Sequence, residues 1–214
     1  MENNDLPSRT IPQRTKPADR HVFKKREKCI AVDATGFSTE TYACWRNHRP
    51  GTKKAQEREW LKLHAAVTSV LKAIPSMEVT DGNVHDCCEF KNLLDSLPLE
   101  DVEAVTADSA YLSRRNCDLV EAIGAKPYIN LKKNISVLRA KGSKAWFDMI
   151  FSYKKNPKAW RKIYHSRSSA ETAFSAIKRK FGHQLSSIRK DNQRKELMTK
   201  VVAYNLNILA RRRI

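Results

Sequence analysis

Three carboxylic acids stand out because of where they lie in the hydrophobic pattern. Asp33 directly follows the apolar run Cys29–Val32, and Asp108 directly follows Val102–Ala107. Open α/β sheets build their sites where strands end, so two parallel neighbouring strands would bring both carboxylates to one edge of the sheet. For either acid alone, the competing explanation is that an Asp after a strand opens a turn.

The third acid, Glu171, lies between apolar residues of a predicted helix. Tyr164, Arg167 and Lys178 precede or follow it at helical intervals, so all four fall within an arc of roughly 60°. A solvated helix face would explain the two cations, since Arg167 and Glu171 are spaced for a weak ion pair. It explains less well why an aromatic hydroxyl joins the same row.

Positive charge is concentrated in the second half of the chain. The protein has 214 residues, with 41 Lys and Arg against 23 Asp and Glu. Residues 1–110 hold 16 basic and 17 acidic side chains, whereas residues 111–214 hold 25 and 6. This imbalance indicates a polyanionic partner, with nucleic acid as the first choice. A well-solvated basic surface is the alternative.

The helical row reads Y-x2-R-x3-E-x6-K from Tyr164 to Lys178. This spacing resembles the YREK signature of the DDE transposases encoded by prokaryotic insertion sequences. IAVDATGF around Asp33 resembles the first-acid strand of that family, and ADSAY around Asp108 resembles its second-acid motif. Three further segments are similar to its connecting regions and closing helix: KLH at 62–64, TDGNVHD at 80–86 and AYNLNILARR near the C-terminus. The resemblance covers about residues 28–213.

The resemblance implies an α/β fold of the RNase H-like type, with a mixed central sheet flanked by helices. It also implies that Asp33, Asp108 and Glu171 are the catalytic acids and the ligands of two Mg²⁺ ions, which Mn²⁺ can replace. Three carboxylates without Cys or His ligands suit this metal. Asp33 would bridge both ions, and Asp108 and Glu171 would each hold one.

Contacts with DNA are implied for the other members of the signature. Arg167 and Lys178 would clamp phosphates that flank the scissile bond, and Tyr164 would hydrogen-bond a phosphate. Arg161 and Lys162 belong to a basic stretch just before the glutamate helix, where they could follow the DNA backbone.

The implied activity is metal-dependent phosphodiester hydrolysis at transposon ends, followed by strand transfer through 3′-OH attack on target DNA. Such an enzyme is expected to work as a homodimer on DNA, in the cytoplasm with the nucleoid, and without a membrane anchor. Two alternatives stay open: a catalytically silent or domesticated DNA-binding derivative, and an RNase H-like nuclease without strand transfer. Because Asp33 lies so close to Met1, most of the family's usual N-terminal region is expected to be missing, as in a truncated copy.

Hydrophobic periodicity and turn residues predict the elements that must position these groups. Strands are expected at 29–32, 39–45, 60–71, 77–80, 102–107 and 126–130. Helices are expected at 85–97, 113–123, 164–181 and 194–210, with Leu197, Val201, Leu206 and Leu209 facing inward on the last. Residues 34–36 have the composition of a turn, Gly124 and Gly182 end two helices, and residues 131–160 fit no pattern. Residues 1–27 are expected to form a flexible basic leader ahead of one domain at 28–214.

Composition excludes two classes of protein. No stretch approaches the roughly 18–20 apolar residues that span a bilayer, and no apolar signal segment opens the chain. An odd number of cysteines without a CxxC pair indicates reduced thiols rather than a secreted disulfide scaffold. Core packing is favoured over base stacking for Trp146 and Trp160.

Overall fold

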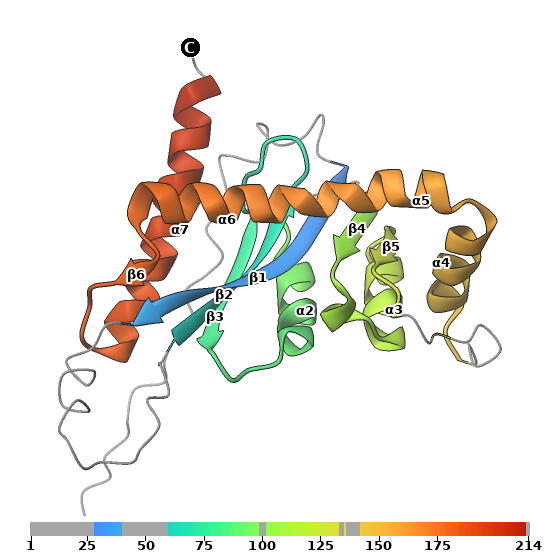
Figure 1. The fold of residues 1–214 in the computed structure, drawn as a ribbon, viewed down its shortest axis with the longest axis horizontal. Helices are drawn as coiled ribbons and strands as arrows, with labels where there is room; N and C mark the ends of the chain where they lie inside the picture. Colours follow the sequence, from blue (N-terminus) through green and yellow to red (C-terminus); the bar gives the residue numbers. More distant parts are fainter. Residues whose placement is uncertain (1–27, 40–59, 99–101, 133–134, 136–141, 213–214) are drawn as a thin grey trace, which may run out of the picture.

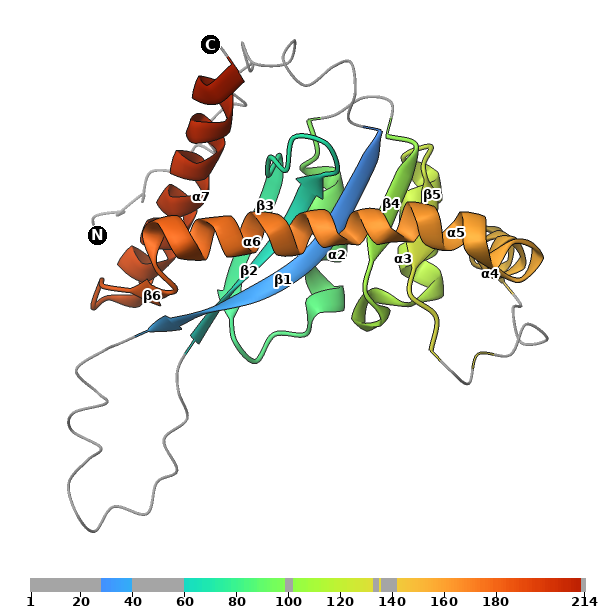
Figure 2. The same cartoon turned by 45° about the horizontal axis from the view of Figure 1, so that its top comes forward.

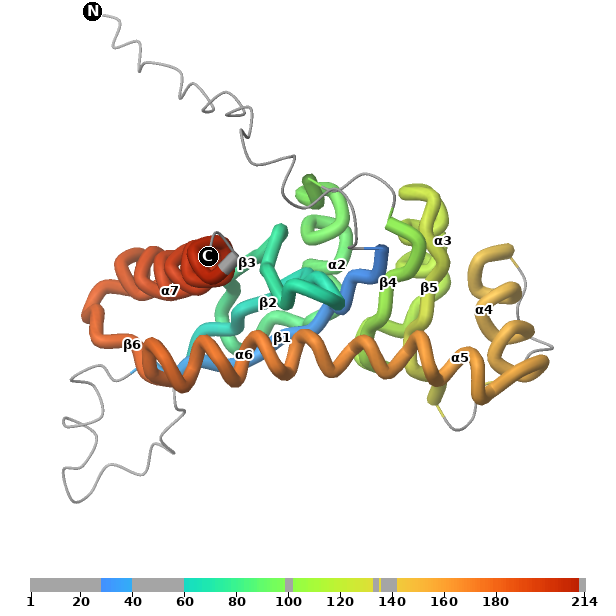
Figure 3. Tube along the Cα trace, turned by 90° about the horizontal axis from the view of Figure 1, so that it is seen from above, coloured from blue at the N-terminus to red at the C-terminus, as the bar shows by residue number. Residues whose placement is uncertain are grey.

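The structure is a computed structural model that describes residues 28–39, 60–98, 102–132, 135 and 142–212. A central sheet carries helices on both faces (Figure 1; Figure 3). Its strands are β1 (Cys29–Thr39), β2 (Trp60–Thr68), β3 (Ser76–Asp81), β4 (Ala104–Ala107), β5 (Lys126–Ile129) and β6 (Gln184–Leu185). The α-helices are α2 (Asp86–Asp95), α3 (Arg114–Ala122), α4 (Lys144–Lys155), α5 (Pro157–Tyr164), α6 (Ser168–Phe181) and α7 (Lys190–Arg212). Two 3₁₀ turns, η2 (Ser109–Tyr111) and η4 (His165–Arg167), complete the described elements.

The sheet is mixed, as expected. Its strand order is β3-β2-β1-β4-β5, and β6 pairs with the end of β1. β2 runs antiparallel to both β1 and β3, whereas β4 and β6 are parallel to β1 and β5 is parallel to β4. This order and these directions are those of the RNase H-like fold, which confirms the predicted fold class.

Alternation along β1 divides the interior into two cores, because successive side chains of a strand point to opposite faces. Ile30 and Val32 point to the face that carries α2 and α3, and they belong to a core cluster that also includes side chains of α4 and α5. Ala31 and Phe37 pack on the other face with α6 and α7. Figure 2 shows α6 crossing this second face of the sheet.

β1 corrects one expectation from the sequence. Residues 34–36, predicted to form a turn, continue the strand, which pairs with β2 from Ile30 to Ser38. Gly36 serves a different purpose, since a Cβ at this position would lie 2.6 Å from the ring of Trp60. Its glycine character therefore reflects a close approach across the sheet. The predicted strand at 39–45 lies outside the described residues beyond Thr39.

The segment before the glutamate corrects a second expectation. α4 and the first half of α5 lie within residues 131–160, to which the sequence assigned no element. Ser143 and Asn156 cap these helices by accepting hydrogen bonds from the backbone N–H groups of Trp146 and Ala159. Trp160 is buried and Trp146 packs partly buried against the same core, so neither is an exposed stacking platform. The single helix predicted for 164–181 is instead the end of α5, the η4 turn and α6.

α7 docks on the turn that joins β2 to β3. In this turn Lys72 has a positive φ of 61°. Its carbonyl accepts a hydrogen bond from the Tyr204 hydroxyl, and its Nζ donates to Ser169 Oγ on α6. The Asn205 side chain accepts from the N–H of Ile74 and donates to its carbonyl, over 3.0 and 2.8 Å. These bonds tie both helices to one backbone turn.

Other expectations are borne out more closely. The remaining predicted strands and helices form within a few residues of their predicted ends, and Gly124 and Gly182 follow α3 and α6 with φ of +79° each. On α7, Leu197 and Val201 are buried as expected, but Leu206 is 60% exposed. The helix packs through Tyr204 and Ile208 instead, so its inward face is rotated from the predicted one.

Candidate active site

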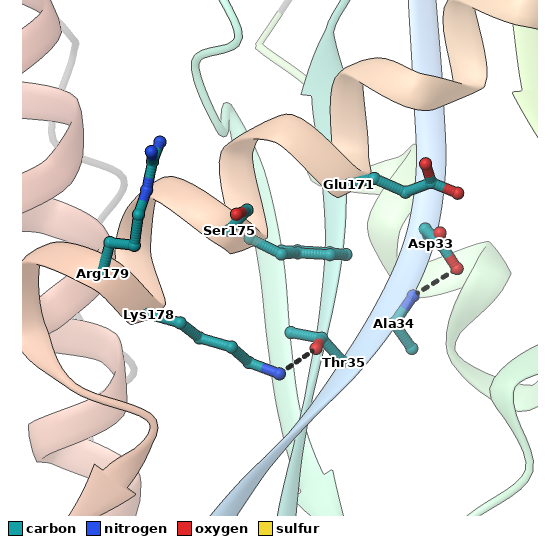
Figure 4. A pocket seen from close by; sticks show the side chains of 8 residues that line it. Asp33, Ala34, Thr35, Glu171, Ser175, Lys178 and Arg179 are labelled. Carbon is teal, nitrogen blue, oxygen red and sulfur yellow. Dashed lines mark hydrogen bonds between the residues drawn. The ribbon is translucent and has the colours of Figure 1, made fainter.

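A cleft lies between β1 and the middle of α6. It has a volume of about 490 Å³. Its polar lining comes from two acids, two cations and two hydroxyls: Asp33, Glu171, Lys178, Arg179, Thr35 and Ser175. Figure 4 shows the carboxylates of the two acids close together at one end of this cleft. Charged groups of both signs therefore face one solvent-open space.

Asp33 is placed by the alternation of β1. It belongs to the same face as Ala31 and Phe37, the face that α6 covers. Its Oδ1 accepts a hydrogen bond from the N–H of Ala34 at 2.9 Å, and its side chain is 19% exposed. The strand thus holds one partly buried carboxylate in the wall of the cleft.

Asp108 follows β4, the parallel neighbour of β1. Val32 and Ala107 are partners in the register, so Asp33 and Asp108 occupy the next positions of adjacent strands. Asp108 Oδ1 also accepts a hydrogen bond from the N–H of Ser109 and caps η2. Asp108 therefore both opens a turn and lies beside Asp33.

Arg167 connects Asp33 with the third acid, Glu171. Its Nη1 lies 2.9 Å from Asp33 Oδ2, and its Nη2 lies 2.5 Å from Glu171 Oε1. Glu171 stands in the first turn of α6, where the helix dipole favours a negative charge. One guanidinium therefore bridges a carboxylate from β1 and a carboxylate from α6.

Burial and neighbouring charges act in opposite directions on these groups. Burial raises the pKa of Asp33, and the like charges of Asp108 and Glu171 act the same way, against the Ala34 hydrogen bond and Arg167. Partial burial disfavours the charge of Arg167, but the attraction of Asp33 and the other acids raises its pKa overall. The acids and this cation are thus electrostatically dependent on one another.

Lys178 lies at the other end of the cleft. Its Nζ donates to Thr35 Oγ1 at 2.7 Å (Figure 4). The same Nζ lies 5.3 Å from the centre of the Phe37 ring. Burial lowers the pKa of Lys178 below its usual value. The amine is held against β1, two strand positions from Asp33.

The remaining expected contact residues lie before α6. Tyr164 ends α5 and stacks on Trp160 with ring centroids 5.3 Å apart. Burial raises the pKa of its phenol, so Tyr164 is a neutral donor at physiological pH. Arg161 and Lys162 are exposed in the last turn of α5 and do not line the described cleft.

Five lining residues were not predicted from the sequence, and one of them, Phe174, is apolar. Thr35 and Ser175 supply hydroxyls, Ala34 a backbone amide, and Arg179 a second cation. Thr35 follows Asp33 by two, the period of a strand, and that spacing would have identified it. Arg179 also lines a second hollow of about 260 Å³ between α6 and α7, together with the cations Lys180 and Arg211. Figure 4 shows Arg179 pointing away from Lys178.

The donor set suits a hard divalent cation. Asp33 and Glu171 already direct one oxygen each at a shared cation, the guanidinium of Arg167, and Asp108 lies at the end of the adjacent strand. Carboxylate oxygens are the ligands that Mg²⁺ prefers. Within the described part of the chain, however, no three His, Cys, Asp or Glu side chains are grouped so that they could hold a metal ion in this conformation.

Comparisons with known proteins give the family. The model of the transposase DDE domain matches residues 24–206. A Mos1 transposase paired-end complex with left transposon end is 11% identical, with 78% of this chain and 67% of that chain covered and a TM-score of 0.33. A pre-cleavage Mos1 transpososome is 12% identical, with 70% and 56% covered and a TM-score of 0.34, so the chain spans little more than half of that neighbour. The family match takes in both strand-end acids and the whole of α6, and the chain therefore belongs to the transposase DDE domain family.

Proposed function

We propose that this domain cleaves DNA at transposon ends and joins the freed 3′-OH to target DNA, with Asp33, Asp108 and Glu171 as its catalytic acids. The observation that supports this most directly is the convergence of Asp33 and Glu171, from β1 and α6, on one cation. Asp108 stands at the end of the neighbouring parallel strand. Asp33 and Glu171 come from separate elements and line one cleft, although each alone has an ordinary structural explanation.

Two Mg²⁺ ions, or Mn²⁺ in their place, are the cofactors of this proposal. Bound between the acids, the pair would activate a water or 3′-OH and neutralise charge on the scissile phosphate. Asp33 is the proposed shared ligand because it lies between the other two acids in the fold. Asp108 and Glu171 would each complete one metal site with oxygen donors.

The proposed partner is the DNA backbone. Lys178 and Arg167 stand at the two ends of the cleft and are placed to pair with phosphates beside the scissile bond. Tyr164 adds a neutral hydroxyl next to Arg167. Arg161 and Lys162 continue the positive surface along α5 toward the duplex.

Assembly and location follow from the substrate. Joining two transposon ends needs two active sites, so we propose a homodimer on DNA that acts in the cytoplasm with the nucleoid. None of the described helices is long and apolar enough to cross a membrane.

A cleavage assay tests the function. Duplexes with and without a free 3′-OH donor end are incubated with the protein and Mg²⁺, and both nicked and joined products are counted. Loss of all products in Asp33→Asn, Asp108→Asn and Glu171→Gln, with DNA binding retained, is the expected result. Nicking without joining would favour a simple nuclease, and binding without either product would favour a silent DNA-binding derivative.

A further inference from the structure

Arg167 contacts the two acids that line one end of the cleft. Its two terminal nitrogens contact Asp33 Oδ2 and Glu171 Oε1, which come from residues 134 and 4 positions away in the sequence. The side chains of Arg167 and Asp33 are 24% and 19% exposed, whereas Glu171 is 58% exposed. The guanidinium is thus partly shielded and bonded on two sides.

The contacted oxygens are the ones that a metal ion would need. Asp33 Oδ1 is already bonded to the N–H of Ala34, so Oδ2 is the oxygen of this residue that faces a cation. Glu171 gives one oxygen to the same guanidinium. A divalent ion and Arg167 would therefore compete for the same carboxylate oxygens. Two cations so close together would also repel each other.

Arg167 is also placed to move. It ends the one-turn η4 segment and is also the N-cap residue of α6, with helical φ and ψ of −54° and −34°. Neither η4 nor α6 has a side-chain hydrogen bond that caps its N-terminus. A long side chain on such a junction can leave the carboxylates without unfolding an element.

We propose that Arg167 is the resident counter-cation of the acidic cluster in the DNA-free protein and competes there with the divalent ion. DNA relieves the competition, because a phosphate offers the guanidinium a two-pronged partner of its own. Metal binding and DNA binding are then positively coupled through one side chain, and the free enzyme resists metal loading. This inference rests on the proposed function, since it assumes that the acids bind the metal.

Mn²⁺ alone, added to the DNA-free protein, tests the competition without any turnover. Bound and free Mn²⁺ are counted by electron paramagnetic resonance for wild type, Arg167→Gln and Arg179→Gln. Removing a unit charge a few ångströms from the ion should tighten Mn²⁺ binding about tenfold in Arg167→Gln. Arg179→Gln is the matched control, because Arg179 lines the cleft and makes no described contact with either acid. Its affinity should change much less.

A second arm measures the coupling. A short duplex should raise the Mn²⁺ affinity of wild type about tenfold and leave that of Arg167→Gln nearly unchanged, because its competing cation is already gone. Arg167→Lys, which keeps the charge but not the two-armed contact, should lie between them. Circular dichroism establishes that each variant is folded, and Arg167→Lys alone still tests the inference should Arg167→Gln fail to fold.

The outcomes separate this inference from the function beneath it. Mn²⁺ binding that is lost in Asp33→Asn, yet equal in wild type, Arg167→Gln and Arg167→Lys, would overturn the competition and leave the proposed function standing. Equal tightening in Arg179→Gln would overturn it too, since the effect would then be general charge. No Mn²⁺ binding that depends on Asp33 in any variant would overturn both.

Discussion

Polar side chains make different kinds of contact in two regions of the molecule, the cleft and the turn after β2. In the cleft, Arg167 pairs with Asp33 and Glu171 through the ends of side chains that stay partly exposed. At the turn after β2, Asn205 bonds both backbone groups of Ile74, and Tyr204 bonds the carbonyl of Lys72. The first set joins side chains to each other, and the second joins side chains to backbone.

This difference indicates that the motifs shared with the family have two roles, one in the active site and one in holding the fold together. Ion pairs between partly exposed side chains are weak and exchange partners easily. Side-chain bonds to a turn's backbone are costly to lose, because the backbone groups have no other partner. The C-terminal AYNLN segment thus positions α7, whereas the Tyr164 to Lys178 row serves the cleft. Four substitutions test this division, from the largest expected effect to the smallest.

Asp33→Asn should remove activity without removing stability. Mg²⁺-dependent cleavage should fall by at least about a thousandfold, or about 4 kcal/mol of barrier. Burial raises the pKa of Asp33, so its ionised form costs folding free energy at neutral pH, and the neutral amide avoids that cost. The metal-free melting temperature at neutral pH should therefore not fall. A clearly lower melting temperature would show that the Asp33 carboxylate is structural.

Asn205→Ala should do the reverse. Two backbone groups of Ile74 lose their partner, which should lower the free energy of unfolding by about 2–3 kcal/mol in urea titrations. Asn207→Ala is the control on the same helix, because Asn207 bonds only the carbonyl of Ala203 and Lys180. Cleavage per folded molecule should be unchanged in both. A selective loss of cleavage in Asn205→Ala would contradict the division.

Lys178→Ala should weaken DNA binding without disturbing the fold. We expect an affinity loss of about three- to tenfold and a salt dependence that is less steep by about one unit, as for one lost phosphate contact. Burial lowers the pKa of Lys178, so its removal relieves an unfavourable charge in the free protein. Lys195→Ala, exposed on α7, is the control. An equal effect in the control would mean that only total charge matters.

Asp81→Asn should have the smallest effect, and it should depend on pH. Hydrogen bonds from Arg194 and Lys190 lower the pKa of Asp81, so its ionised form stabilises the start of α7. This contribution is present above the unfolded-state pKa and is lost as pH falls through the lower folded-state value. Because the pair is exposed, we expect less than about 1 kcal/mol in urea titrations at neutral pH. The difference from wild type should vanish in strong acid, and a difference that persists there would reflect packing instead.

Much of the framework could be predicted from local patterns. Apolar runs located β1 and β4, and so placed Asp33 and Asp108 at neighbouring strand ends once those strands paired in parallel. Gly124 and Gly182 marked helix ends because both need a positive φ there.

What the sequence could not supply were contacts between distant segments. Gly36 is a residue typical of turns, but it lies within β1, which pairs with β2, and Trp60 of β2 packs over it. Leu206 fits an apolar periodicity, yet tertiary packing turned α7 so that this side chain is exposed. The Arg167 to Asp33 contact spans 134 residues, so no local periodicity could have indicated it.

The η4 turn has a consequence for how such chains can vary. A 3₁₀ turn winds three residues per turn, so Tyr164 and Arg167, three apart, lie nearly above one another. Substitutions between these two residues would leave the alignment intact. Inserting or deleting a single residue would instead rotate the Tyr164 ring about the helix axis by roughly a third of a turn relative to Glu171. Across descendants of this gene, the count of residues from Tyr164 to Glu171 should therefore be preserved more strictly than the identity of those between them.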